Sequence, residues 1–210
     1  LLRGEYPISE GPFVVAVSDP MPEVRAARRL RVALEEAGVA IDGVARLGLP
    51  SDMPNGRGRI LAELSSRPLR DLLRRILWSS HNWYADMLAL TLSKEVAGTG
   101  RFDDGVGVVS SFLAGLSAGE STSSPRPWLR DGSGLSPANL VTPISIVGLL
   151  GHALERSWGE TLVGALAGPG EGTLAGWGSV PQVAAKTGTL RHTVGLAGFL
   201  DAGPEGPVIF

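Results

Sequence analysis

The sequence contains no cysteine, only two lysines, Lys94 and Lys186, and no apolar run near the roughly 18 residues that a membrane-spanning helix needs. The absence of cysteine excludes disulfide bridges and thiolate metal ligands. The formal net charge is −2 and the sequence has no basic cluster, so it does not indicate a nucleic-acid-binding surface. With 43% hydrophobic and 19% charged residues, the 210-residue chain has the composition of a soluble globular protein with a sizeable core.

Both ends of the sequence have the pattern of interrupted structure. The chain begins at Leu1 rather than at methionine, and no positively charged segment followed by an apolar one precedes it, so we expect any secretion signal to be cleaved or to lie outside this chain. Residues 207–210 have the pattern of a strand that is just beginning. We therefore expect the chain to be incomplete at both ends.

Residues 12–46 predict a β-α-β segment without a catalytic side chain. Residues 13–17 form a short apolar run between turn signals, which is typical of a buried strand. Apolar residues then recur at helical spacing from Val24 to Ala37, and Gly38 follows where a helix would end. Residues 39–46 predict a second strand.

A stretch rich in Gly, Pro, Ser, Asp and Asn follows at residues 48–59, and it predicts a linker. We place the domain boundary near Ala62. The expected organisation is an accessory lobe over residues 1–62 and a second domain over residues 63–210.

Two helices are predicted on either side of the tripeptide Ser80-His81-Asn82. Leu69 to Leu77 carry an apolar stripe with Ser66 as the expected cap, and residues 83–96 are apolar on most sides, so we expect this second helix to be buried. The tripeptide admits two interpretations. Its Ser and Asn are preferred helix caps, and a hydroxyl and a carboxamide held by two buried helices are equally suited to relaying a proton and holding a peptide backbone.

A further helix is predicted within residues 98–125, followed by a polar loop. Residues 131–136 read Asp-Gly-Ser-Gly-Leu-Ser, and Thr142-Pro143 opens another helix. The Gly-x-Gly in this run is not a nucleotide loop, because neither a preceding strand nor a phosphate-binding lysine accompanies it.

Residues 183–190 and 194–200 predict a β-hairpin around a polar turn at Arg191-His192. Its first strand contains Lys186-Thr187-Gly188-Thr189. The lysine ammonium and the two threonine hydroxyls suit a carboxylate, and Gly188 lets a ligand approach the backbone. The sequence therefore predicts a carboxylate site on this strand, although a surface turn has the same pattern.

In combination these motifs resemble a known enzyme family. Ser-x-Asn and Lys-Thr-Gly stand in the chain order typical of class A β-lactamases and penicillin-binding proteins, but the Ser-x-x-Lys that carries the nucleophile is absent, because neither lysine has a serine three positions earlier. The sequence more closely resembles the D-alanyl-D-alanine carboxypeptidase/endopeptidase family, the low-molecular-mass class C penicillin-binding proteins. The resemblance covers nearly the whole chain, with residues 131–136 as its most discriminating run.

The resemblance implies an α+β fold, a penicillin-binding-protein or β-lactamase-like transpeptidase domain with an antiparallel sheet and an all-helical subdomain. Residues 1–62 would be the end of a lobe inserted upstream of Ser-x-Asn. Ser80 would pass a proton toward the leaving group, Asn82 would bind the substrate backbone, and Lys186, Thr187 and Thr189 would receive its terminal carboxylate. The backbone N–H of Thr189 would form half of the oxyanion hole.

The same resemblance implies a serine hydrolase that acts outside the cytoplasm on peptidoglycan stem peptides ending in D-Ala-D-Ala and is acylated by β-lactams, with no metal or other cofactor. The chain itself, lacking the serine, is expected to be inactive alone. A non-catalytic peptidoglycan-binding homologue is the alternative interpretation, and a β-lactamase is a less favoured one.

Three histidines need interpretation. His81 occupies the middle of Ser-x-Asn, where aspartate is common in the family, and a histidine there suggests activity that varies with pH near neutrality. His152 fits a helix interior and His192 a turn, so neither is predicted to bind metal or to take part in catalysis.

Overall fold

The structure is a computed structural model that describes residue 11 and residues 19–49, 52, 60–117, 126–178 and 182–210. The chain divides into two compact units, Leu1–Leu64 and Ser65–Phe210. Among the described residues, no helix is long and apolar enough to cross a membrane.

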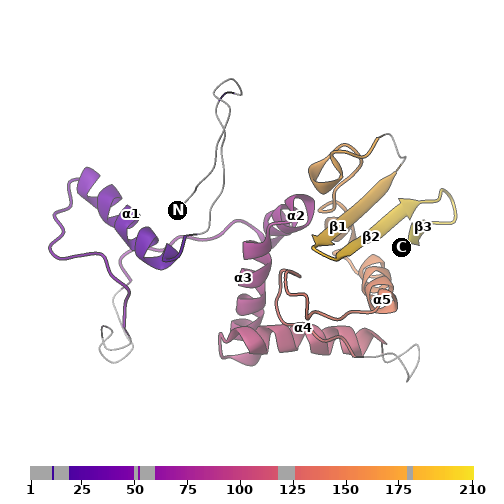
Figure 1. Cartoon of the computed structure of the whole chain (residues 1–210), viewed down its shortest axis with the longest axis horizontal. Coiled ribbons are helices and arrows are strands. Elements are labelled where there is room, and N and C mark those ends of the chain that lie inside the picture. Colours follow the sequence, from indigo (N-terminus) through magenta and orange to yellow (C-terminus); the bar gives the residue numbers. More distant parts are fainter. Residues whose placement is uncertain (1–10, 12–18, 50–51, 53–59, 118–125, 179–181) are drawn as a thin grey trace. The chain divides into compact units, whose positions relative to one another are not determined.

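The described part of the first unit contains helix α1 (Pro22–Glu36), which confirms the predicted helix (Figure 1). Proline opens it, and Gly38 follows its end with φ of +82°, an angle that suits glycine. The predicted strand over residues 39–46 is wrong, because these residues form no strand, and Val44 is 80% exposed. A strand needs a partner for its N–H and C=O groups. Its expected partner, residues 13–17, lies outside the described residues, as does most of the predicted linker.

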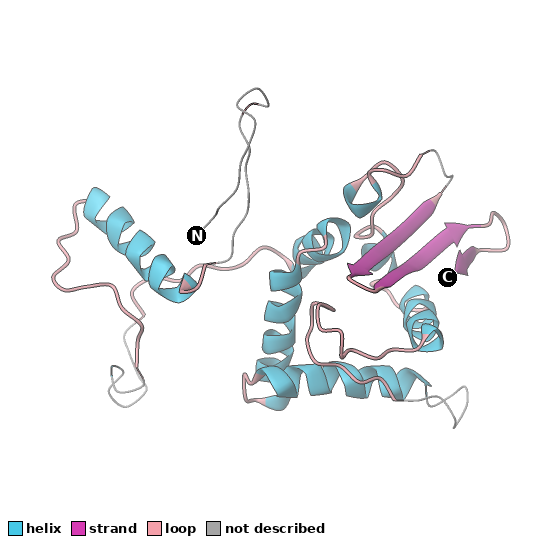
Figure 2. Cartoon of the chain, viewed as in Figure 1, coloured by secondary structure: helices cyan, strands magenta, loops and turns pink. Residues whose placement is uncertain are grey.

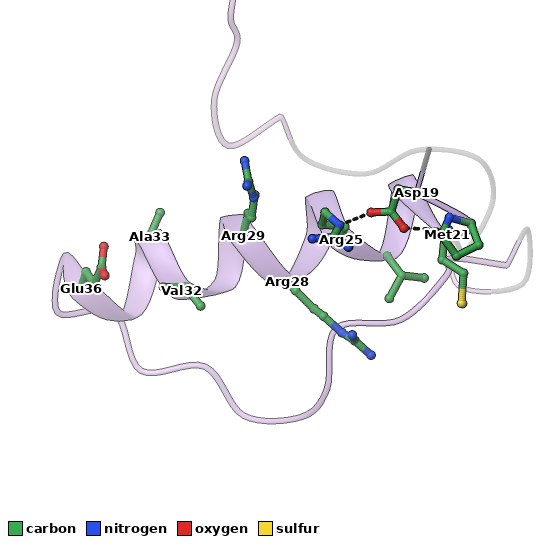
Figure 3. A pocket seen from close by; sticks show the side chains of 10 residues that line it. Asp19, Met21, Arg25, Arg28, Arg29, Val32, Ala33 and Glu36 are labelled. Carbon is green, nitrogen blue, oxygen red and sulfur yellow. Dashed lines mark hydrogen bonds and ion pairs between the residues drawn. The ribbon is translucent and has the colours of Figure 1, made fainter. Parts of the chain in front are cut away.

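A surface hollow of 590 Å³ lies beside α1 and is lined by ten residues, charged and apolar, between Asp19 and Glu36 (Figure 3). Asp19 lies before the helix, accepts the N–H of Met21 and pairs with Arg25. The bond from Met21, followed by the Arg25 guanidinium, lowers the pKa of the Asp19 carboxyl. The hollow shares no residue with the predicted catalytic motifs.

The second unit combines helices with an antiparallel sheet (Figure 2), which confirms the expected α+β class. Its regular elements in chain order are α2 (Leu69–Ser79), α3 (Asn82–Leu92), the π-helical turn η4 (Ser93–Ala97), α4 (Phe102–Ser117), α5 (Pro143–Leu154), α6 (Gly159–Val163), the 3₁₀ turn η5 (Gly172–Leu174), β1 (Val183–Leu190), β2 (Thr193–Asp201) and β3 (Pro207–Ile209).

Helices α2 to α5 lie where the sequence predicts them, but their details differ. Pro68, not Ser66, is the residue before α2, and the Ser66 hydroxyl donates to the adjacent Arg67 carbonyl instead. Helix α3 is less buried than expected: Trp83 is 59% exposed, and Ala89 is its one buried residue. The apolar residues on most sides of α3 therefore predicted more burial than the helix has.

Helices α3 and α4 approach closely at Gly105. A Cβ on this glycine would lie 1.9 Å from the Ala89 carbonyl oxygen, so only glycine fits there. Helix α5 begins at a side-chain cap, because the Thr142 hydroxyl accepts the N–H of Ser145 at 3.3 Å.

The sheet has the order β1-β2-β3, and β1 and β2 form the predicted hairpin. Ala184 pairs with Phe199 and Lys186 with Ala197, so these four residues share one face. Phe199 packs with Leu150 of α5 and with Leu166, and the main core cluster forms around them. The Lys186 side chain thus emerges on the face of the sheet that the helices cover.

Candidate active site

The site is built around Ser80, which lies at the end of α2. Its backbone is left-handed, with φ of +55° and ψ of +54°, and its N–H donates to the Ile76 carbonyl. Most residues avoid this conformation, since their Cβ crowds the following carbonyl oxygen. The reversal ends α2 and lets α3 begin two residues later.

This junction disfavours the capping interpretation of the tripeptide. His81 is the residue before α3 and makes no side-chain cap, and Asn82 is already the first residue of that helix. Ser80 ends α2 through its backbone rather than through its hydroxyl. The Ser80 hydroxyl and the Asn82 carboxamide are therefore not used as caps.

The Ser80 hydroxyl instead meets Lys186 from β1. The Lys186 ammonium donates to Ser80 Oγ at 2.9 Å and also to the Thr187 carbonyl. Figure 1 shows the end of α2 beside β1. Burial lowers the pKa of Lys186, because the charged amine is partly removed from water. The structure thus brings together the two motifs that the sequence singled out.

Strand β1 is at the edge of the sheet, and its pairing decides which backbone groups face outward. Ala185 exchanges both hydrogen bonds with Ala167, on the side away from β2. Backbone groups alternate in direction along an antiparallel strand, so those of Thr187 and Thr189 also point outward. No strand pairs with this edge beyond Ala185 in the part of the chain that the structure describes. The Thr189 N–H is therefore directed at an open sheet edge.

The side chains of the Lys-Thr-Gly-Thr run divide between the two faces of β1. Lys186 lies on one face and Thr187 and Thr189 on the other, as strand alternation requires. Gly188 and Thr189 are exposed, whereas Lys186 and Thr187 are partly buried. A carboxylate would reach all three polar side chains only at the outer edge of the strand.

The loop at residues 131–136 is held by its aspartate. The Asp131 carboxylate accepts the N–H groups of Gly134 and Ser136 at 2.7 and 2.6 Å, and the Asn139 amide at 2.9 Å. The Gly132 N–H donates to Asp86 of α3 at 3.1 Å, so the loop is tied to the helix that begins at Asn82. Sequence reasoning did not identify Asp86 as its partner, because the two lie 46 residues apart.

The histidines occupy the expected kinds of position. His81 contacts the Tyr84 ring, with centroids 4.3 Å apart, and its Nδ1 is buried with no hydrogen-bond partner among the described residues. His152 lies within α5 and accepts from Arg156, and His192 lies exposed in the hairpin turn. Neither His152 nor His192 contacts Ser80 or Lys186 in the interactions found for the described residues.

Comparison with known proteins connects this geometry to one family. The sequence model of the D-Ala-D-Ala carboxypeptidase 3 (S13) family matches residues 1–210. The chain is 35% identical over 220 residues to a D-alanyl-D-alanine carboxypeptidase from Actinomadura sp. (strain R39), covering 100% of this chain and 40% of that protein. It is 31% identical over 202 residues to the D-alanyl-D-alanine carboxypeptidase DacB of Haemophilus influenzae, covering 90% and 40% respectively.

The solved structures agree with the sequence relatives. The crystal structure of penicillin binding protein 4 (dacB) from Haemophilus influenzae, in complex with a β-lactam, matches with a TM-score of 0.73 at 30% identity. The match covers 88% of this chain and 42% of that one. The chain thus spans about 40% of the length of the relatives that it matches.

Proposed function

This chain belongs to the D-Ala-D-Ala carboxypeptidase 3 (S13) family, and from that premise we propose that it is the proton-transfer and substrate-binding part of a serine carboxypeptidase or endopeptidase acting on peptidoglycan stem peptides. The hydrogen bond from Lys186 to Ser80, beside an open strand edge, is the observation that carries this proposal. The substrate ends in D-Ala-D-Ala, and the protein acts outside the cytoplasm, where peptidoglycan lies.

The direction of the Lys186–Ser80 bond suits proton transfer to a leaving group. Because Lys186 donates to Ser80 Oγ, the hydroxyl proton of Ser80 is free to point at the substrate. When the D-Ala-D-Ala bond breaks, this proton passes to the departing amine nitrogen, and Lys186 returns a proton to Ser80. The lowered pKa of Lys186 eases that return, because a less basic amine gives up its proton more readily.

The open edge of β1 suits an extended peptide. A substrate backbone laid along this edge pairs with the outward N–H and C=O groups of Thr187 and Thr189, as in other cases of strand addition. Its terminal carboxylate then lies within reach of the Lys186, Thr187 and Thr189 side chains. Asn82 holds the substrate backbone from the opposite side, and the Thr189 N–H stabilises the oxyanion.

The nucleophile is a serine outside these 210 residues, because the sequence contains no Ser-x-x-Lys. That serine attacks the D-Ala-D-Ala carbonyl, D-alanine leaves with the proton from Ser80, and water then hydrolyses the acyl-enzyme. β-Lactams acylate the same serine. No step in this scheme requires a metal or another cofactor.

Covalent labelling with a fluorescent penicillin tests the proposal. The reagent is applied in parallel to this chain and to the longest product of its gene, and the adduct is measured by mass after denaturation. We expect labelling of the longer product alone, at a serine followed three residues later by lysine. Labelling of the 210-residue chain itself would show that the assignment of the nucleophile is wrong.

The absence of a Ser-x-x-Lys also supports a second candidate, a non-catalytic homologue that binds peptidoglycan through the same carboxylate site. The same experiment separates the two candidates. If neither protein is labelled while the longer product still binds a peptide ending in D-Ala-D-Ala, the binding function is the correct one.

A further inference from the structure

The turn Glu171–Leu174 contacts both of the elements that carry the site. Its η5 segment packs against α2 and β1. Leu174 is fully buried with Ala167 and Ala185, and Trp78 and Val183 pack against this cluster. The turn therefore joins the helix that ends at Ser80 to the strand that carries Lys186.

The turn holds the end of α2 at two points on a single residue, Trp78. The Trp78 indole N–H donates to the Glu171 carboxylate at 3.2 Å. Gly172 lies against the Trp78 backbone, and a Cβ on Gly172 would be 2.2 Å from the Trp78 carbonyl oxygen. Trp78 precedes Ser80 by two residues, so both contacts act within the last turn of α2.

The turn contains one unfavourable feature, a buried hydroxyl, whereas its left-handed backbone at Gly172 suits glycine. Gly172 has φ of +47°, and the Thr173 hydroxyl oxygen is buried with no hydrogen-bond partner among the described residues. A buried hydroxyl without a partner costs free energy, so such groups are rare in folded proteins. Because this cost must be offset elsewhere, we attribute the position of the turn to its packing against Trp78 and the Leu174 cluster.

We propose that Glu171 and Gly172 are positioning residues that hold the C-terminal turn of α2 so that Ser80 Oγ reaches Lys186 Nζ. This inference rests on the proposed function, since it gives these residues a part in the same proton transfer. Ser80 occupies a left-handed conformation that its surroundings must maintain. Its 2.9 Å bond to Lys186 would be lost if the end of α2 moved by about an ångström, because hydrogen bonds weaken steeply beyond their normal range.

The test uses two matched pairs of variants in the longest product of the gene. Gly172→Ala introduces the clash with Trp78, whereas Gly170→Ala imposes a similar backbone strain, at φ of +79°, with no atom within 4 Å of the new Cβ. Glu171→Ala removes the acceptor for the Trp78 indole, whereas Glu171→Gln keeps an oxygen that accepts the same bond.

Two quantities are measured for each variant. The first is the rate of acylation by the fluorescent penicillin. The second is the pH midpoint of acetylation of Lys186 by acetic anhydride, read on its peptide by mass, with Lys94 as the internal reference. In Gly172→Ala and Glu171→Ala we expect the acylation rate to fall roughly 10- to 100-fold. The Lys186 midpoint should move upward, because a displaced α2 exposes the amine to water.

Gly170→Ala and Glu171→Gln should keep both values near those of the wild type. The inference is wrong if Gly172→Ala and Glu171→Ala keep the wild-type acylation rate and Lys186 midpoint. It is also wrong if Gly170→Ala and Glu171→Gln change these two values as much as Gly172→Ala and Glu171→Ala do. If circular dichroism shows that Gly172→Ala is unfolded, the Glu171 pair decides alone. If the wild-type product takes up no penicillin, the proposed function fails, and the Lys186 midpoint still tests the positioning.

Discussion

At the scale of single residues, Ser80 combines an unfavourable backbone with a hydrogen bond from Lys186. Its left-handed conformation ends α2 and turns its hydroxyl toward Lys186. Strained residues of this kind persist where the rest of the fold holds them, and they are frequent at functional sites. The strain at Ser80 has a measurable consequence for stability.

We expect Ser80→Gly to be more stable than Ser80→Ala by about 1 kcal/mol, because glycine adopts the left-handed conformation without a Cβ clash. Both variants lose the hydrogen bond to Lys186, so the difference between their free energies of unfolding measures the cost of the left-handed backbone at residue 80. Urea unfolding measures both free energies. Equal stability of the two variants would show that Ser80 is not strained.

Lys186 should make stability depend on pH in the alkaline range. Burial lowers its pKa below the ordinary value of 10.5, so between the lowered value and 10.5 the unfolded chain binds more protons than the folded one. The free energy of unfolding therefore rises with pH through that window. As pH falls below the lowered pKa, both states are protonated and the gain is lost.

Urea unfolding from about pH 7 to about pH 11 measures this rise. Lys186→Met should flatten it, whereas the matched variant of the exposed Lys94, Lys94→Met, should retain it. Parallel curves for the wild type and Lys186→Met would contradict the assignment of the effect to Lys186.

At the scale of elements, the packing of α3 on α4 depends on one glycine. Gly105 lies against the Ala89 carbonyl, whereas Gly107, two residues along the same helix, has open space where a methyl group would extend, with no atom within 4 Å. Helix α3 begins at Asn82, so this contact also supports the site. The two glycines form a natural pair for mutation.

Gly105→Ala should destabilise the protein by about 2 kcal/mol or more, because the added methyl group forces the two helices apart. Gly107→Ala should stabilise it by roughly 0.5–1 kcal/mol, since alanine favours helix more than glycine does. Thermal unfolding compares the two variants. A Gly105→Ala protein as stable as the wild type would show that the helices do not approach this closely.

At the scale of the whole molecule, the chain consists of two units with a connection that lacks regular structure. Residues 60–68 form neither helix nor strand, and Leu61 and Leu64 are 80% and 96% exposed. The unit Ser65–Phe210 contains the site and its own core around Leu150, Leu166 and Phe199. It therefore has the features of a separately folding part.

Limited digestion with chymotrypsin should cleave first at Leu61 or Leu64, because exposed backbone without secondary structure is the preferred substrate of proteases. Mass spectrometry identifies the first products. A fragment starting near Ser65 should resist further digestion longer than the rest of the chain does. Initial cleavage within α2 to α5 would contradict this division.

The sequence alone determined those elements whose stability comes from local interactions. The apolar periodicity of α2, α4 and α5, the start of α5 at Thr142-Pro143 and the β1–β2 hairpin were all predicted, because helix faces, a proline in the first turn and tight turns depend on neighbours in the chain. The family was also readable from short motifs. The roles of all six site residues stay predictions, because nothing in the free chain tests them: Ser80, Asn82, Lys186, Thr187, Gly188 and Thr189.

Only the tertiary structure decided how distant segments meet. It brings Lys186 onto Ser80 across 106 residues and Glu171 onto Trp78 across 93, and no local pattern encodes either contact. It also shows that the side chains of Ser80 and Asn82 do not cap helices, and that residues 39–46 form no strand. In each case the physical reason is the same: a strand partner, a buried amine and a strained backbone are set by packing between segments rather than by neighbouring residues.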